Sequence, residues 1–387
     1  MQWTNAVLDR LRTESDPEVD GMVGEYLRDR TGSIPELLSP MIRHVVIPEE
    51  DRSPEIGRWL AQKPPLPEWA RPALIDEGVR FFAANGPDIL LSLLLASLPE
   101  CYAARKGVQV LHLTARLLSD PQRRLVETAQ MVVDVMTPGG LNPGGRGYET
   151  ARRVRLMHSG IRWLIASDPN VVNTSNPHET RPHYDPEWGT PINQEDLVGT
   201  LLTFSVVILD ALEKMGEPVS REEAEAYHHA WNVVGFLIGV DPKLLPIPLD
   251  DARMLMDVIR TRHQKPCKEG QAMTAAALAF AQKATVLPWL QGLPAATMRH
   301  LIGNRTADVI DVPRPDWTVL LVGGIAQTKR LFSLVGGERV LRLLTADFNR
   351  RLVETLLVFG RGETRPAFDI PTHLADEWRV RRPVLSI

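Results

Sequence analysis

The chain has 387 residues with a formal net charge of -4, and 44% of the residues are hydrophobic and 24% charged. This is the composition of an ordinary globular protein. The small acidic excess argues against a nucleic-acid binder, which would carry a basic excess. The two cysteines, Cys101 and Cys267, are isolated in the sequence, which excludes a disulfide framework and a zinc site of the Cys type.

The N-terminal residues, MQWTNAVLDRLRTESD, mix charged and apolar residues and lack the uninterrupted apolar core of a signal peptide. The most apolar run, residues 89–98, is about half of the ~20 residues needed to cross a bilayer. We therefore expect that run to be a buried helix, with no transmembrane segment and a cytoplasmic location.

Helix start and stop signals recur along the whole chain, and no alternating strand pattern of useful length is present. Ser220 and Glu223 form a capping box, and Asn193 with Asp196 three residues later starts another helix. In chain order we expect short helices near 25–30 and 34–46, helices over 121–136, 147–167, 193–215 and 220–239, and a pair broken at Gly323-Gly324 and Gly336-Gly337.

The sequence thus predicts an all-α protein built as a single large helical domain. Residues 1–60 form an N-terminal extension packed on the core, 61–305 form the core, and 306–387 add helices and a tail to the same domain. The stretch 170–192 is rich in Asn, Pro and His and is expected to be a long ordered loop of functional importance.

Arg155, His158 and Arg162 follow the spacing i, i+3, i+7 on the predicted 147–167 helix and so share one face. A neutral imidazole can ligate iron, and guanidinium groups can pair with the carboxylates of a haem. The sequence has no Cys-x-x-Cys-His, so a haem would be held non-covalently.

The preceding helix carries Arg124, Glu127, Thr128 and Met131 on one face by the same rule. Residues 138–147, PGGLNPGGRG, connect the two helices. At 1.5 Å per residue, Thr128 and His158 lie roughly 12 and 16 Å from this connection, within a helical turn of each other in depth. Directly packed helices are too close to hold a porphyrin, so we expect the connection to let them splay.

Spacing alone also permits plainer interpretations. A single helical histidine is more often a core or surface residue than a ligand. Arg124 and Glu127 can form a surface ion pair, and Thr128 can bond a carbonyl one turn back.

Four ordered segments resemble the catalytic domain of the latex-clearing proteins, or rubber oxygenases, and of related fungal oxygenases. They cover about residues 75–265 and include SLPECYAARKGVQVLHLTARLLSDPQRRLVETAQMVVDVMTPGGL, ARRVRLMHSGIRWL, WGTPINQEDLVGTLLTFS and EAYHHAWNVVGFLIGV. The resemblance implies a globin-like haem-binding core with haem b. It implies His158 as the proximal ligand within Arg155-x-x-His158-x-x-x-Arg162, and places Arg124, Glu127 and Thr128 among the distal residues.

That resemblance further implies an oxygenase that activates O2 to oxidise a small, apolar, unsaturated organic substrate and that uses an electron donor. Arg124 and Thr128 would donate hydrogen bonds, Glu127 would move protons, and Arg155 and Arg162 would contact the propionates or brace the proximal helix. The sequence departs from the family at Glu127, where a lysine can cap the iron. Glutamate has no amine, so lysine capping is impossible here, and this position could instead hold water, bind iron directly or act as a base.

Other histidines carry weaker patterns. His112 is the second candidate for an axial ligand. His178 and His183 have no recognised zinc spacing, and His228-His229 is expected to be packed in the core. Three other functions remain open: a haem peroxidase or peroxygenase, a globin-like sensor or carrier without turnover, and a helical interaction protein without haem.

Overall fold

The computed structural model describes residues 3–28, 54–117, 121–167, 184–283, 285, 288–314, 317–322, 324, 353 and 370–378, and the statements below refer to these. Within them the chain is helical, with a single isolated β-bridge between Ala104 and Gln264. The helices are α1 Asn5–Leu11, α2 Pro17–Arg28, α4 Pro54–Ala61, α5 Pro72–Ser92, α6 Leu98–Ala103, α7 Val108–Leu117, α8 Pro121–Val135, α9 Arg146–Ser167, α10 Gln194–Lys214, α11 Arg221–Leu237, α12 Leu249–His263, α13 Lys268–Lys283, α14 Leu293–Val309 and α17 Thr372–Glu377. The expected all-α fold is confirmed.

Capping hydrogen bonds are present at the two helix starts that the sequence predicted. The Asn193 side chain accepts from the backbone N–H of Asp196 at the start of α10. At the start of α11, Ser220 and Glu223 form the reciprocal capping box. Because these caps satisfy backbone N–H groups that a helix leaves open, they fix where the two most buried helices begin.

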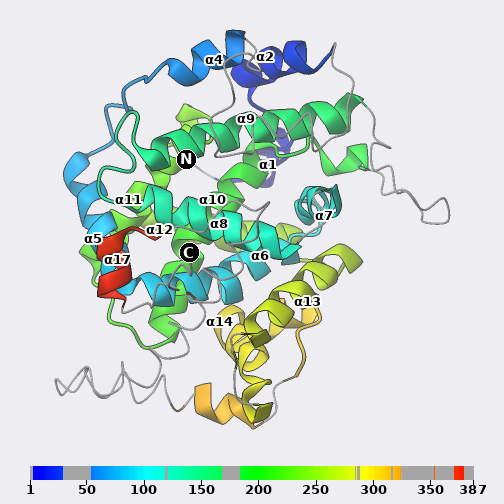
Figure 1. The fold of residues 1–387 in the computed structure, drawn as a ribbon. Coiled ribbons are helices and arrows are strands. Elements are labelled where there is room, and N and C mark those ends of the chain that lie inside the picture. Colours follow the sequence, from blue (N-terminus) through cyan, green and yellow to red (C-terminus); the bar gives the residue numbers. More distant parts are fainter. Residues whose placement is uncertain are drawn as a thin grey trace, which may run out of the picture.

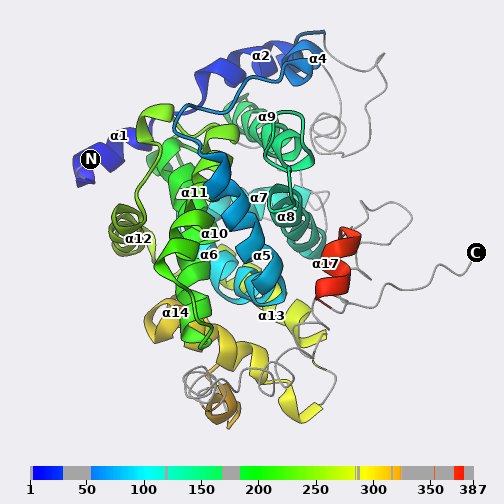
Figure 2. The same ribbon diagram turned by 90° about the vertical axis from the view of Figure 1, so that its left-hand side faces the viewer.

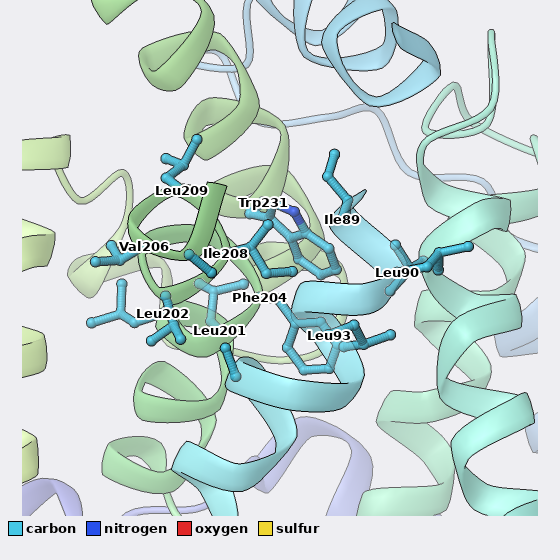
Figure 3. Close-up of a cluster of buried hydrophobic side chains, with 14 of the residues drawn as sticks. Ile89, Leu90, Leu93, Leu201, Leu202, Phe204, Val206, Ile208, Leu209 and Trp231 are labelled. Atoms are coloured by element: carbon cyan, nitrogen blue, oxygen red, sulfur yellow. The ribbon is translucent and has the colours of Figure 1, made fainter. Parts of the chain in front are cut away.

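The apolar run is the centre of a longer helical stretch. α5, the five-residue π-helical turn η2 (Leu93–Ser97) and α6 follow one another without a break. Figure 3 shows Ile89 of this stretch beside Trp231 of α11, and Leu93 beside Phe204 of α10. By length and composition, residues Pro72–Ala103 could cross a membrane, but 67% of the most apolar window is buried inside the protein. That burial is typical of a core helix, as expected for residues 89–98.

α9 is the long helix that organises one side of the molecule. In Figures 1 and 2 it runs across the upper part, with α2 and α4 above it and α8 below it, while α13 and α14 lie at the opposite end. α9 packs against both α2 and α8. A second hydrophobic cluster, which includes Val19, Val23, Leu156 and Ile161, fills the space between α2 and α9. One face of α9 is therefore covered by the N-terminal helices, which leaves the other face for α8.

The glycine-rich connection between α8 and α9 is tighter than the sequence suggested. Gly139 has φ 71°, a left-handed conformation that suits glycine in a turn. A Cβ on Gly147 would lie 2.6 Å from the carbonyl oxygen of Asp134, so only glycine permits this approach. The buried Asp134 then accepts hydrogen bonds from Gln130 and Thr150. The two helices are held together at this end, and space between them opens only farther along.

Candidate functional site

A cavity lies between α8 and α9 and reaches the central helices. Its volume is about 230 Å³. For comparison, an engineered apolar cavity of roughly 150 Å³ already binds benzene. The side chains that surround it are mostly apolar: Leu98, Cys101, Tyr102, Leu111, Thr114, Leu125, Glu127, Thr128, Met131, Thr150, Arg153, Val154, Met157, His158, Ile161, Thr200, Leu201, Phe204, Trp231, Val234, Ile238 and Met273.

His158 lines this cavity from α9 and is partly buried. The wall on the same helix is a stripe spaced i, i+4, i+7 and i+11, formed by Thr150, Val154, Met157 and Ile161. At about 100° per residue, His158 lies at the border of this stripe, with its imidazole toward the cavity side of the helix.

Arg155 and Arg162 do not line the cavity. The Nε of Arg155 lies 2.6 Å from Oδ2 of Asp16, and its Nη2 lies 2.8 Å from Oε2 of Glu18. Burial opposes the charge of Arg155, but the hydrogen bond and the charge of Asp16 outweigh it, and its pKa is raised.

Arg162 is held by the same neighbouring helix. Its Nη2 lies 2.6 Å from Oδ1 of Asp20, and its Nη1 donates to the carbonyl of Ile192 at 3.2 Å. Both arginines therefore occupy the contact between α9 and α2, which fits the expectation that they brace the helix of His158. Their contact with propionates stays a prediction. Although Arg155 and Arg162 share a face of the helix with His158, they lie more than 100° around the helix from the centre of the cavity-lining stripe and so point away from the cavity.

The opposite wall comes from α8, where Glu127 and Thr128 both line the cavity. The structure thus brings Glu127, Thr128 and His158 around one space, as the depth argument from the sequence predicted. Arg124 lies on α8, but its side chain is outside the described part of the chain, so its place at the site stays a prediction.

A cysteine is part of the wall formed by the central helices. The Sγ of Cys101 lies 3.2 Å from Oγ1 of Thr203, and burial raises the pKa of the thiol to about 11. At neutral pH this group is a neutral thiol, and the thiolate is the form that binds metals. Sequence reasoning did not single out Cys101, because its position after the π-helical turn cannot be read from an isolated cysteine.

The remaining histidines are placed as follows. His112 is partly buried on α7 and is not among the cavity-lining residues. His228 hydrogen-bonds through Nε2 to the carbonyl of Ile247 at 2.8 Å, and His229 accepts from the backbone N–H of Arg71 at 3.0 Å, so both are packed as expected. His178 and His183 lie outside the described residues. Within the described part, no group of three or more His, Cys, Asp or Glu is arranged to hold a metal ion.

Sequence reasoning also missed Arg153, which lines the cavity from α9. The signal was present in the apolar stripe of that helix. Thr150, Val154 and Met157 mark the face that looks into the cavity, and Arg153 lies on the same face by helical spacing.

Comparison with known proteins shows which family has this sequence pattern and this fold. Residues 79–331, well over half of the chain, match the family described as "ER-bound oxygenase mpaB/B'/Rubber oxygenase, catalytic domain". The rubber oxygenase of Streptomyces sp. (strain K30) is 24% identical over 312 residues, covering 79% of this chain and 72% of that protein. The structure of latex clearing protein in the closed state aligns with a TM-score of 0.69 at 21% identity, covering 93% of this chain and 95% of the other.

The fold is similar to that of the latex clearing protein, an all-helical architecture. The chain belongs to the mpaB and rubber oxygenase catalytic-domain family. The resemblance read from the sequence motifs is therefore confirmed.

Proposed function

We propose that the protein is a haem-b-dependent oxygenase that uses O2 to oxidise a small, apolar, unsaturated organic substrate. One observation carries the proposal: His158 faces, across an apolar cavity, the polar side chains Glu127 and Thr128 of α8. The family supports oxygenase chemistry. The haem, the histidine ligand and the substrate belong to the proposal.

The residues of the cavity fit a non-covalent haem by their donor chemistry. His158 is the cavity-lining imidazole, and imidazole is a common axial ligand of haem iron. The walls beside it are apolar, with Leu125, Met131 and Val154 among them, which suits the faces of a porphyrin. When bound, haem b would supply an iron centre at which O2 can be activated.

On the proximal side, the chain fixes the helix that bears His158. Arg155 and Arg162 anchor α9 to α2, one turn on either side of the histidine, through Asp16 and Asp20. A ligand on a helix tied at both sides keeps its direction, because rotating the helix would break both ion pairs. This bracing acts through His158 and makes Arg155 and Arg162 positioning residues.

On the distal side, Thr128 supplies a hydroxyl that can orient O2 by hydrogen bonding. Glu127 supplies a carboxylate oxygen that can accept a proton and return it. Arg124, on the same helix one turn earlier, would add a second hydrogen-bond donor. Glu127 stands where other members of the family can have a capping lysine, so this residue would offer no amine to an iron bound in the cavity.

The deeper walls favour an apolar substrate. Phe204 and Trp231 stack with ring centroids 4.9 Å apart, and both line the cavity. Leu201 and Val234 extend this surface. A substrate with a carbon–carbon double bond would bury its chain against these rings, since apolar burial is favourable at about 25 cal/mol per Å².

Purified protein with haem b tests the proposal. We expect a Soret band after haem supplementation and uptake of O2 with oxidation of an unsaturated terpene or lipid in the presence of a reductant. Turnover with H2O2 but not with O2 and reductant would identify a peroxygenase instead, a reaction for which Glu127 beside the haem is also suited. Stable O2 binding without oxidation would support a carrier, and absence of a Soret band would contradict the haem proposal.

A further inference from the structure

α9 carries five arginines, and four of them have partners that account for their position. Arg146 pairs with Asp134, Arg155 with Asp16, and Arg162 with Asp20. Arg152 stacks 3.9 Å from the ring centroid of Trp59 and donates to the carbonyl oxygen of that residue. These four guanidinium groups are engaged in holding the helix to its surroundings.

Arg153 is the fifth, and its side chain lines the cavity. Among the described residues, no hydrogen bond or ion pair engages it. The acidic side chain that also lines the cavity, Glu127, lies on the opposite helix, and no ion pair joins the two. A guanidinium that lines a mostly apolar wall and has no anionic partner among the described residues is available to pair with an anion that enters the cavity.

We infer that Arg153 is a carboxylate-binding residue of the cavity. A guanidinium presents two parallel N–H donors that match the two oxygens of a carboxylate, and this geometry favours a carboxylate over a hydroxyl. Arg153 precedes His158 by five residues, about 7.5 Å along the helix axis. It therefore lies to one side of the proposed iron ligand.

Two molecules bring a carboxylate to this place. One is the cofactor of the proposed function, through a propionate. The other is a substrate that joins an apolar chain to an acid group, which the apolar walls around Phe204 and Trp231 would bind by its chain. The inference deepens the proposed function and rests on it for the first source but not for the second.

The test compares wild-type protein with Arg153→Leu, Arg153→Lys and the control Arg80→Leu. Arg80 is an exposed arginine on α5 that pairs with Glu77 on the same helix. In the first arm, protein is loaded with haem b or with its dimethyl ester, whose propionates carry no charge, and the rate of haem transfer to apomyoglobin is measured. In the second arm, calorimetry compares dodecanoic acid with dodecanol.

If a propionate is the partner, wild-type protein will lose the dimethyl ester about tenfold faster than haem b, the scale of one charge-assisted hydrogen bond. In Arg153→Leu the two rates will converge, in Arg153→Lys the difference will be intermediate, and Arg80→Leu will behave as wild type. If a substrate acid is the partner, wild-type protein and Arg80→Leu will bind dodecanoic acid more tightly than dodecanol. Arg153→Leu will lose this preference, and Arg153→Lys will show an intermediate one.

Wild-type ratios in Arg153→Leu in both arms would overturn the inference. Protein that takes up neither form of haem would contradict the proposed function instead. In that case the acid-against-alcohol comparison on the haem-free protein still decides the role of Arg153. Circular dichroism of Arg153→Leu separates loss of binding from loss of fold.

Discussion

Arg155 and Asp16 form a two-point ion pair across the contact between α9 and the start of α2. Nε lies 2.6 Å from Oδ2, and Nη2 lies 2.8 Å from Oδ1. Asp16 is 5% exposed, so its carboxylate is buried against this partner. Glu18 adds a contact to the same guanidinium, and the charge of Arg155 lowers the pKa of Glu18 against the opposing effect of burial.

Replacing Arg155 with Leu leaves the buried Asp16 without its partner. We expect a loss of roughly 3 kcal/mol in the free energy of unfolding, because an uncompensated buried charge is strongly destabilising. Since the pair also positions the helix of His158, haem should be lost faster than from wild type. The control Arg58→Leu removes an exposed pair with Glu55 on α4 and should cost less than about 1 kcal/mol. Equal denaturation midpoints for both variants would show that the ion pair contributes little.

His228 makes the unfolding free energy depend on pH. Burial lowers its pKa to about 4 from an ordinary value of 6.5, against the opposing hydrogen bond to Ile247. The unfolded chain therefore binds a proton between pH 6.5 and 4 that the folded chain does not. The free energy of unfolding is therefore not reduced by His228 above pH 6.5. It falls by up to roughly 3 kcal/mol as the pH decreases from 6.5 toward 4.

His228→Gln tests this assignment, because the glutamine amide can keep the donor toward the Ile247 carbonyl without titrating. Urea unfolding at several pH values between 4 and 7 should show a shallower loss of stability in the variant, smaller by about one proton. His229, whose pKa burial also lowers to about 4, remains in both proteins. Identical slopes would assign the acid sensitivity to other groups.

Cys101 should react slowly with alkylating reagents. Its pKa of about 11, caused by burial, leaves the thiolate roughly 100-fold scarcer at pH 8 than in a thiol of pKa 9.0. In a Cys267→Ser background, where Cys101 alone reports, the rate with iodoacetamide should still rise about tenfold per pH unit between 8 and 10. A rate that levels off by pH 9 would show that the thiol is not desolvated.

The helices themselves could be predicted from the sequence, but part of the site could not. The Ser220 cap and the apolar periodicity of residues 121–136 depend only on neighbouring residues. The helices that they predict are therefore present in the fold. The side chain of Arg155 is directed by Asp16, 139 residues away, and no local pattern reports that contact. A face defined by i, i+3, i+7 spacing is wide enough that its two edges can meet different partners. Here Arg155 and Arg162 bind acidic residues at α2, whereas His158 lines the cavity.

The connection between α8 and α9 shows the same limit. A connection of ten residues rich in glycine predicts that the two helices can separate. In the structure Gly147 has the opposite effect, because its missing side chain permits close contact with Asp134. The prediction that Glu127, Thr128 and His158 share one space was nevertheless right, because depth along two connected helices depends only on residue counts.

Glu127 is expected to control proton movement at the distal face. Glu127→Gln should keep fold and haem but change the pH dependence of turnover, since it removes an ionisable group at nearly constant volume. Glu127→Lys should give a six-coordinate, low-spin spectrum through an amine ligand. Because no amine at this position closes the site in wild type, azide and imidazole should bind readily to the wild-type ferric protein and poorly to the lysine variant. A lysine variant with the wild-type spectrum from neutral to alkaline pH would place residue 127 away from the iron.

The most direct test is the absorption spectrum of haem-loaded His158→Ala beside that of His112→Ala. His112 serves as the matched control because it is a partly buried histidine of the neighbouring α7 that does not line the cavity. We expect His158→Ala to lose or alter the Soret band with helical content retained, to recover a histidine-like spectrum when imidazole is added, and His112→Ala to match wild type. Wild-type haem content and an unchanged spectrum in His158→Ala would contradict the assignment of His158 as the axial ligand.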